Sequence, residues 1–246
     1  MGNSLSGARR QKETQIGSSC SICLRAQRLA RSDTLFYFVA LDSQPRLDEL
    51  LAAAGLTPLQ ATQNKKLINY LSLLLRWNAR TNLTAVRDAD SILERHFVES
   101  IACAQFLPPG IATLLDYGSG AGFPGLPIAI CRPEIVATLA ESQNKKAAFL
   151  REAVRSTGVS ARVHSDRAET LDEKFDCVTL RAVDRMELAV RSAGSLVALG
   201  GWLAPLTTYA ELPETYAAAG ALYDWSDIKP LPGSDQRVLA LGQRRG

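Results

Sequence analysis

The residues best suited to chemistry stand together in one glycine-rich stretch, DYGSGAGFPG, from Asp116 to Gly125. A short apolar run leads into Asp116, and apolar residues at helical spacing follow Gly125. This order predicts a strand, a turn resembling a phosphate-binding loop and a helix, which together open a doubly wound α/β fold. Glycines suit such a turn because they adopt positive φ and let a ligand approach the backbone. The stretch therefore predicts a ligand-binding turn.

The glycine spacing fits two kinds of ligand. Gly120, Gly122 and Gly125 match the G-x-G-x-x-G pattern of dinucleotide-binding folds. Asp116, Gly118, Gly120 and Gly122 match D-x-G-x-G-x-G, the first motif of class I methyltransferases, which use S-adenosylmethionine. The turn alone does not choose between these ligands, and a glycine-rich turn without any ligand is the third interpretation.

Length and charge limit what the chain can be. Its 246 residues suffice for one sizeable α/β domain with a small appendage, and no apolar run approaches the ~20 residues of a membrane span. Of the 28 basic and 25 acidic residues, six and three lie in residues 1–44, which leaves 22 of each sign in the remainder. Bulk charge therefore does not indicate a nucleic-acid partner, and any RNA must bind a local patch.

The five cysteines show no spacing typical of a metal site. Cys20 and Cys23 form a single C-x-x-C pair, with no second pair or histidines close by. The other three lie in apolar contexts, where we expect them to pack as small hydrophobic residues. We therefore expect no bound metal and a cytoplasmic location, where thiols stay reduced.

Three regions follow one another along the chain. Residues 1–44 are rich in Ser and Arg and lack periodicity, so we expect a disordered or non-native leader. Residues 45–110 are expected to form a helical cap, with one helix ending at Gly55, one starting at Pro58 and one from about 90 to 107. Residues 111–246 are expected to form a Rossmann-like domain.

Seven strands are expected in the last region. The first ends at Asp116, and the others lie near 135–140, 160–164, 175–180, 202–206, 221–225 and 237–241. We expect helices near 143–157, 186–199 and 213–219, with Gly200 and Gly201 breaking the second of these. A mostly parallel sheet with a late antiparallel pair, together with Asp116, favours a class I methyltransferase over a dinucleotide dehydrogenase.

Several polar residues stand where the predicted elements end. Glu141 closes the second strand, about 20 residues past the glycines, where a carboxylate can accept hydrogen bonds from ribose hydroxyls. Arg181 follows the fourth strand and either donates to the cofactor or target base, or pairs at the surface with Asp176 or Asp184. His96 and Asn82 precede the sheet. Each either faces the crevice or has a structural role, Asn82 as a cap of the following turn.

Basic residues outnumber acids between residues 65 and 95, six to three. This excess indicates either a solvated helix surface or a patch that faces phosphates. If the patch binds RNA, we expect its contacts to include Arg80, Arg87 and Arg95.

Six segments of the chain occur together in one known family. They are WN at 77–78, NLTAVRD at 82–88, RHF at 95–97, the stretch at 116–125, ESQNKK at 141–146 and RAV at 181–183. On these segments the chain resembles the ribosomal RNA small subunit methyltransferase G family, also called glucose-inhibited division protein B, over roughly residues 46–242. The resemblance implies a class I, Rossmann-like methyltransferase with an N-terminal helical cap.

The resemblance implies transfer of a methyl group from S-adenosylmethionine to N7 of a guanosine in 16S ribosomal RNA. It also implies a bacterial cytoplasmic enzyme that acts on this RNA or on the 30S subunit, which we expect to be a monomer without membrane contact. The cofactor contacts that it implies are Gly118, Gly120, Phe123, Glu141, Ser142, Gln143, Ala168, Glu169 and Arg181.

Guanine N7 carries a free lone pair, so the reaction needs no general base and can rest on alignment and electrostatics. The sequence therefore identifies no catalytic residue, and Arg181, His96 and Asn82 are candidates for positioning. Glu141 replaces the usual Asp of the family, and 205–208 replaces a Lys-Gly that often follows the fifth strand. These departures keep alternatives open: a class I methyltransferase for another RNA, a small molecule or a protein, or a nucleotide-binding module without turnover.

Overall fold

Seven strands form one sheet in the order β3-β2-β1-β4-β5-β7-β6. The computed structural model describes residues 34, 36, 38–183 and 185–246. Strands β1 to β5 pair in parallel, and β7 runs antiparallel to both β5 and β6. Their bounds are β1 Thr113–Tyr117, β2 Val136–Ala140, β3 Ala161–His164, β4 Phe175–Arg181, β5 Val197–Thr208, β6 Tyr223–Pro230 and β7 Arg237–Arg244. The predicted mostly parallel seven-stranded sheet is confirmed.

Both faces of the sheet are covered, as a parallel sheet requires. Successive side chains of a strand point to opposite faces, so Leu114 joins the core under α6 and α7 while Leu115 joins the core under α8. The helices of this part are α6 Gly125–Cys131, α7 Asn144–Thr157, α8 Met186–Ser195 and α9 Leu212–Ala219. Single 3-10 turns lie at η2 Ala168–Thr170, η3 Tyr209–Glu211 and η4 Gly220–Leu222.

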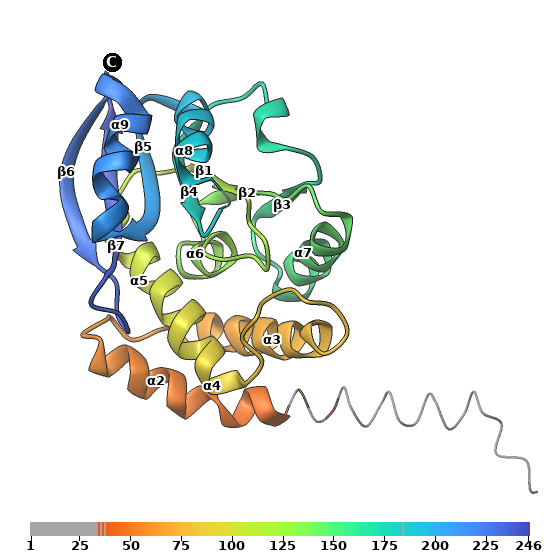
Figure 1. Ribbon diagram of the computed structural model, residues 1–246. Coiled ribbons are helices and arrows are strands. Elements are labelled where there is room, and N and C mark those ends of the chain that lie inside the picture. The colour runs from red at the N-terminus through yellow and green to blue at the C-terminus, as the bar shows by residue number, and fades with distance from the viewer. Residues whose placement is uncertain (1–33, 35, 37, 184) are drawn as a thin grey trace, which may run out of the picture.

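The helices before β1 pack on the α6–α7 side. They are α2 Gln44–Ala53, α3 Ala61–Asn78, α4 Ala89–Ile92, the π-helical turn η1 Leu93–Val98 and α5 Glu99–Phe106. Figure 1 shows α2, α3 and α4 together at one end of the molecule. The apolar side chains of α3, spaced by three and four residues, are buried in one core with those of α6 and α7. The cap thus shares its core with the sheet, and the division into three regions stays a prediction.

One expected helix contains an unexpected turn, and one expected boundary was wrong. The helix expected from about 90 to 107 contains the π-helical turn η1, a feature that periodicity does not reveal. Gly200 and Gly201, expected to separate a helix from a strand, lie within β5, where the register against β4 shifts. A Cβ at Gly201 would lie 2.8 Å from the carbonyl oxygen of Asp176, so these glycines mark an irregularity inside a strand.

Most of the expected leader, residues 1–33, 35 and 37, lies outside the described residues. Residues 38–42 are helical, and Ala40 is buried. Among the described helices, none combines the length and the apolar character that crossing a bilayer requires.

Candidate functional site

The glycine-rich stretch forms the loop between β1 and α6, and Asp116 holds it closed. This carboxylate is buried; Oδ2 accepts a hydrogen bond from the backbone N–H of Gly125 at 3.1 Å, and Oδ1 accepts one from Thr179 Oγ1 at 3.1 Å. A Cβ at Gly125 would lie 2.6 Å from the Asp116 side chain, whereas Gly118 and Gly120 have positive φ. The first and last residues of the motif therefore shape the loop, and Gly118, Gly120 and Phe123 between them line the adjacent cleft.

Asp116 itself is too enclosed to contact a ligand. Burial raises the pKa of Asp116 to about 6, against the opposing effect of its hydrogen-bond donors. Its role is thus to fix the backbone that surrounds the site.

A cleft of about 460 Å³ opens beside this loop at the carboxyl end of the sheet. Half of the predicted site residues line it, namely His96, Gly118, Gly120, Phe123, Glu141, Ser142 and Arg181. The fold thus brings together predicted residues from the ends of β1, β2 and β4 and from the cap, because the carboxyl ends of parallel strands lie at the same edge of the sheet.

A second cleft, of about 550 Å³, continues past Gly118, Glu141 and Ser142, which line both clefts. Ala168 and Glu169, predicted after the third strand, line its far side. We name the two clefts together the crevice. It lies at the carboxyl ends of β1 to β4, where open α/β sheets bind their ligands.

Glu141 fixes the boundary between the two clefts. Its Oε2 accepts the backbone N–H of Gly120 at 2.9 Å, and its Oε1 accepts that of Gln143 at 2.7 Å. Each carboxylate oxygen has a second lone pair, so hydroxyl groups of a ligand can still bind there. The side chain of Gln143 lines neither cleft among the described residues, and its backbone supports Glu141.

Arg181 reaches from the end of β4 into the cap. Its Nη2 donates to Glu99 Oε2 at 2.6 Å and to the carbonyl oxygen of Arg95 at 2.7 Å, and lies 3.1 Å from His96 Nδ1. Glu99 is fully buried, and its Oε1 forms an ion pair with Arg237 Nη2 at 2.7 Å. We name Glu99, Arg181 and Arg237 the Glu99 cluster.

The partner of Arg181 was missed in the sequence. Asp176 binds the backbone of Ala112 and Thr113 instead, and Asp184 lies outside the described residues. Glu99 could have been found in the sequence as a single carboxylate among the apolar residues of a helix. Such a carboxylate needs a buried cation as its partner.

His96 lies in the π-helical turn and lines the crevice. Its Nε2 is 2.9 Å from Thr84 Oγ1, and its ring packs on Phe123 with centroids 5.0 Å apart. His96 Nδ1 lies 3.1 Å from Arg181 Nη2 and 3.1 Å from the carbonyl oxygen of Arg95. Burial, and then the charge of Arg181, lowers the pKa of His96 to about 4. The imidazole is therefore neutral at physiological pH.

Two further residues that sequence reasoning missed hold the cap against the crevice. Tyr70 of α3 is fully buried and donates through Oη to the carbonyl oxygen of Ala121 in the glycine loop at 2.5 Å. Asn78 accepts the backbone N–H groups of Leu83 and Thr84, which places these two residues on the crevice wall. Both side chains bind backbone groups in irregular segments, and the hydrophobic periodicity of a sequence does not predict such contacts.

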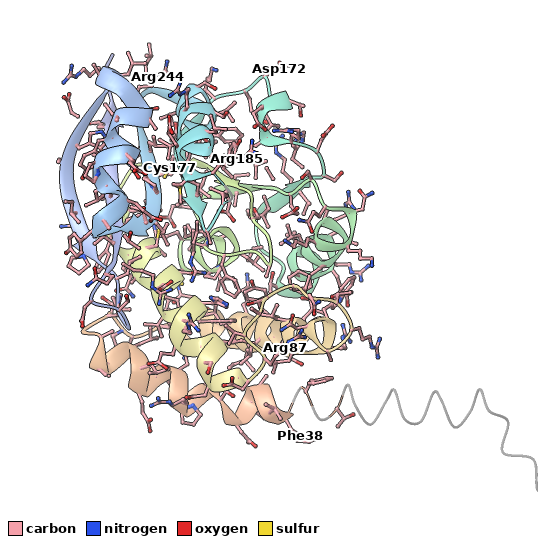
Figure 2. All side chains as sticks on the ribbon, in the orientation of Figure 1. Phe38, Arg87, Asp172, Cys177, Arg185 and Arg244 are labelled. Carbon is pink, nitrogen blue, oxygen red and sulfur yellow. The ribbon has the colours of Figure 1, made fainter. Side chains whose placement is uncertain are left out.

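The predicted RNA contacts lie outside the crevice. Arg87, on the loop after α3 (Figure 2), donates to Asn82 Oδ1 and to the carbonyl oxygen of Asn78, both at 2.5 Å. Asn82 is engaged there and lines neither cleft of the described structure. The side chains of Arg80 and Arg95 are exposed. Within the described residues, no group of three His, Cys, Asp or Glu side chains could hold a metal ion.

Comparison with known proteins identifies the family of this chain. The sequence profile of the family described as rRNA small subunit methyltransferase G matches residues 63–215. The chain is 44% identical over 176 residues to the ribosomal RNA small subunit methyltransferase G of Stenotrophomonas maltophilia strain K279a, covering 68% of this chain and 81% of that one. It is 41% identical over 186 residues to that of Xanthomonas euvesicatoria pv. vesicatoria strain 85-10, covering 73% and 86%.

A solved structure supports the fold alone. A predicted O-methyltransferase from Agrobacterium tumefaciens superposes with a TM-score of 0.51 at 22% identity, covering 60% of this chain and 81% of that chain. The chain therefore belongs to the rRNA small subunit methyltransferase G family, the enzymes that use S-adenosylmethionine to methylate guanine N7 in 16S ribosomal RNA.

Proposed function

We propose that the crevice binds S-adenosylmethionine across its two clefts and presents the methyl group to a guanosine of 16S ribosomal RNA. In this arrangement the adenosine occupies the cleft beside Ala168 and Glu169, and the methionine part occupies the cleft beside His96 and Phe123. The observation that carries the proposal is the continuity of the two clefts through Gly118, Glu141 and Ser142.

The residues present fit this cofactor. Glu141 retains lone pairs for the ribose hydroxyls, and it stands between the two clefts, where the ribose joins the two ends of the molecule. A Cβ at Gly118 would lie 2.8 Å from Val183, so a side chain there would narrow the crevice. These features support Gly118, Gly120, Phe123, Glu141, Ser142, Ala168, Glu169 and Arg181 as cofactor-binding residues, with Gln143 acting through its backbone.

The cofactor supplies a methyl group that is activated by its positive sulfur. When bound, S-adenosylmethionine would supply this methyl group to guanine N7, whose own lone pair would form the new bond while the sulfur keeps the electron pair of the carbon–sulfur bond that breaks. This chain then has to align the three atoms and avoid adding positive charge beside the sulfur. The neutral ring of His96 adds no positive charge beside the sulfur. The Glu99 cluster holds Arg181 in a fixed place, which serves the alignment. His96 and Arg181 are therefore positioning residues in this proposal.

The test uses 30S subunits and naked 16S RNA that lack the modification. Each is incubated with the protein and S-adenosylmethionine carrying a labelled methyl group, and the RNA is digested to nucleosides. The expected result is label in 7-methylguanosine. Label in another nucleoside, or none at any salt concentration, would overturn the proposal.

We also propose that the chain acts as a monomer in the cytoplasm, on 16S ribosomal RNA or on the 30S subunit. The relative rates at which naked RNA and 30S subunits are labelled distinguish these two substrates. Sedimentation of the purified protein at the mass of one chain checks the oligomeric state, and a dimer mass would contradict it.

A further inference from the structure

A separate pocket of about 390 Å³ lies where the last turns of α3 meet the middle of α7. Arg76, Trp77, Arg80 and Thr81 line it from the α3 side, and Glu152 lines it from α7. These residues line neither cleft of the crevice in the part of the chain that the structure describes. Figure 1 shows α3 and α7 as neighbouring helices.

One wall of this pocket is held rigidly. Glu152 Oε1 accepts from Arg76 Nη2 at 2.5 Å, and Glu152 Oε2 accepts from Trp77 Nε1 at 2.9 Å. The indole also packs edge-on against Phe149, with ring centroids 5.7 Å apart. Trp77 is therefore a fixed aromatic surface, and the charge of Glu152 is balanced by Arg76.

The other wall of the pocket carries the positive charge of Arg80. The guanidinium of Arg80 is exposed and makes no hydrogen bond or ion pair with the residues that the structure describes. With Arg76 and Glu152 paired, Arg80 gives the pocket a net positive charge. A ligand that complements it has a planar group for Trp77 and a negative group for Arg80.

We propose that this pocket binds a second nucleotide of the RNA substrate, with its base against Trp77 and its phosphate at Arg80. Proteins recognise single-stranded RNA by stacking unpaired bases on aromatic side chains and contacting phosphates with arginine. The inference rests on the proposed function, because it assumes that RNA is the substrate.

The distance to the crevice suits a nucleotide near the target guanosine. Lys146 of α7 lines the crevice, and Glu152 lies six residues further along the same helix. At 1.5 Å per residue, that is about 9 Å along the helix axis. Six residues also turn the helix by about 240°, so an RNA strand whose guanosine enters the crevice would reach the pocket by following the surface around α7.

The decisive variant is Arg80→Ala, since this exposed side chain has no described partner whose loss would unfold the protein. The matched control is Arg191→Ala on α8, an exposed arginine paired with Glu187. Affinity for unmethylated 30S subunits is measured at several salt concentrations for wild type and both variants. Thermal stability and affinity for S-adenosylmethionine are measured alongside.

We expect Arg80→Ala to weaken binding about tenfold at low salt and to reduce the slope of log affinity against log salt concentration by about one. Arg191→Ala should bind as wild type, and all three proteins should share their melting temperature and cofactor affinity. An Arg80→Ala protein with wild-type affinity and slope would overturn the inference.

The stacking wall has its own test. Trp77→Phe keeps an aromatic face, and Trp77→Leu removes it, so the Leu variant should bind 30S subunits about tenfold more weakly than the Phe variant. Equal binding by two folded variants would overturn the assignment of a base to this wall. If wild type methylates 16S RNA but Arg80→Ala binds 30S subunits as tightly as wild type does, only this inference fails. If wild type does not methylate 16S RNA, the proposed function fails.

Discussion

The glycine loop and the Glu99 cluster both border the crevice, but they are held in different ways. The loop is closed by a contact between Asp116 and Gly125, nine residues apart in one motif. The Glu99 cluster joins α5 to β4, 82 residues away, and to β7. A contact between residues close in sequence belongs to a motif that can be recognised in the sequence. An ion pair between distant residues involves single residues that no motif identifies. The same difference determines how each region should respond to substitution.

The largest effect is expected where the distant charges meet. Glu99→Gln removes the buried carboxylate and leaves Arg181 and Arg237 without their partner, which should cost about 3–5 kcal/mol of unfolding free energy. Urea unfolding measures this cost. Glu134→Gln, which breaks the more exposed pair with Arg132, should cost less than about 1 kcal/mol. Equal losses in the two variants would show that the Glu99 cluster does not hold the crevice together.

The same comparison explains what the sequence could predict. The mostly parallel sheet, the glycine loop and Glu141 follow from short patterns that repeat wherever a parallel sheet binds a nucleotide-like ligand. Glu99 and Tyr70 were missed because their partners are fixed only when distant elements pack. Gly200 and Gly201 look like a break, yet their role depends on how closely β4 approaches β5.

A smaller loss of stability is expected when a side chain is added at Gly125 in the glycine loop. Gly125→Ala places a Cβ 2.6 Å from Asp116 and 2.7 Å from Leu139, which should cost about 1–3 kcal/mol and weaken binding of S-adenosylmethionine. Gly158→Ala at the end of α7 has open space around it but a positive φ. Its cost should be about 1 kcal/mol, with unchanged cofactor affinity by calorimetry. Loss of cofactor binding in both variants would contradict a specific role for Gly125.

Asp116 gives the loop a dependence on pH. Its pKa is about 6 in the folded protein, above the ordinary value of 3.8, so folding favours the protonated form. This contribution is complete below pH 4 and is lost as the pH rises through 6. Asp116→Asn cannot titrate, so the stability of wild type relative to this variant should fall between pH 4 and 6 and then stay level. Thermal unfolding across this range measures the difference, and a constant difference would show that the pKa of Asp116 is not raised in the folded protein.

The smallest effect is expected on the other side of the crevice. The pKa of His96 is about 4, below its ordinary value of 6.5, so the ring stays neutral from pH 5.5 to 8. Over this range the single-turnover rate of methyl transfer should therefore show no inflection that depends on His96. An inflection near pH 6.5 that disappears in His96→Gln would mean that the imidazole titrates in the crevice.

The most direct test of the crevice as the methyl-donor site is a crystal structure of the protein with S-adenosylmethionine. We expect ribose hydroxyls at hydrogen-bond distance from Glu141, the adenine beside Ala168 and the methionine part against Phe123. A cofactor bound elsewhere, or a crevice filled by the protein's own side chains, would contradict this expectation.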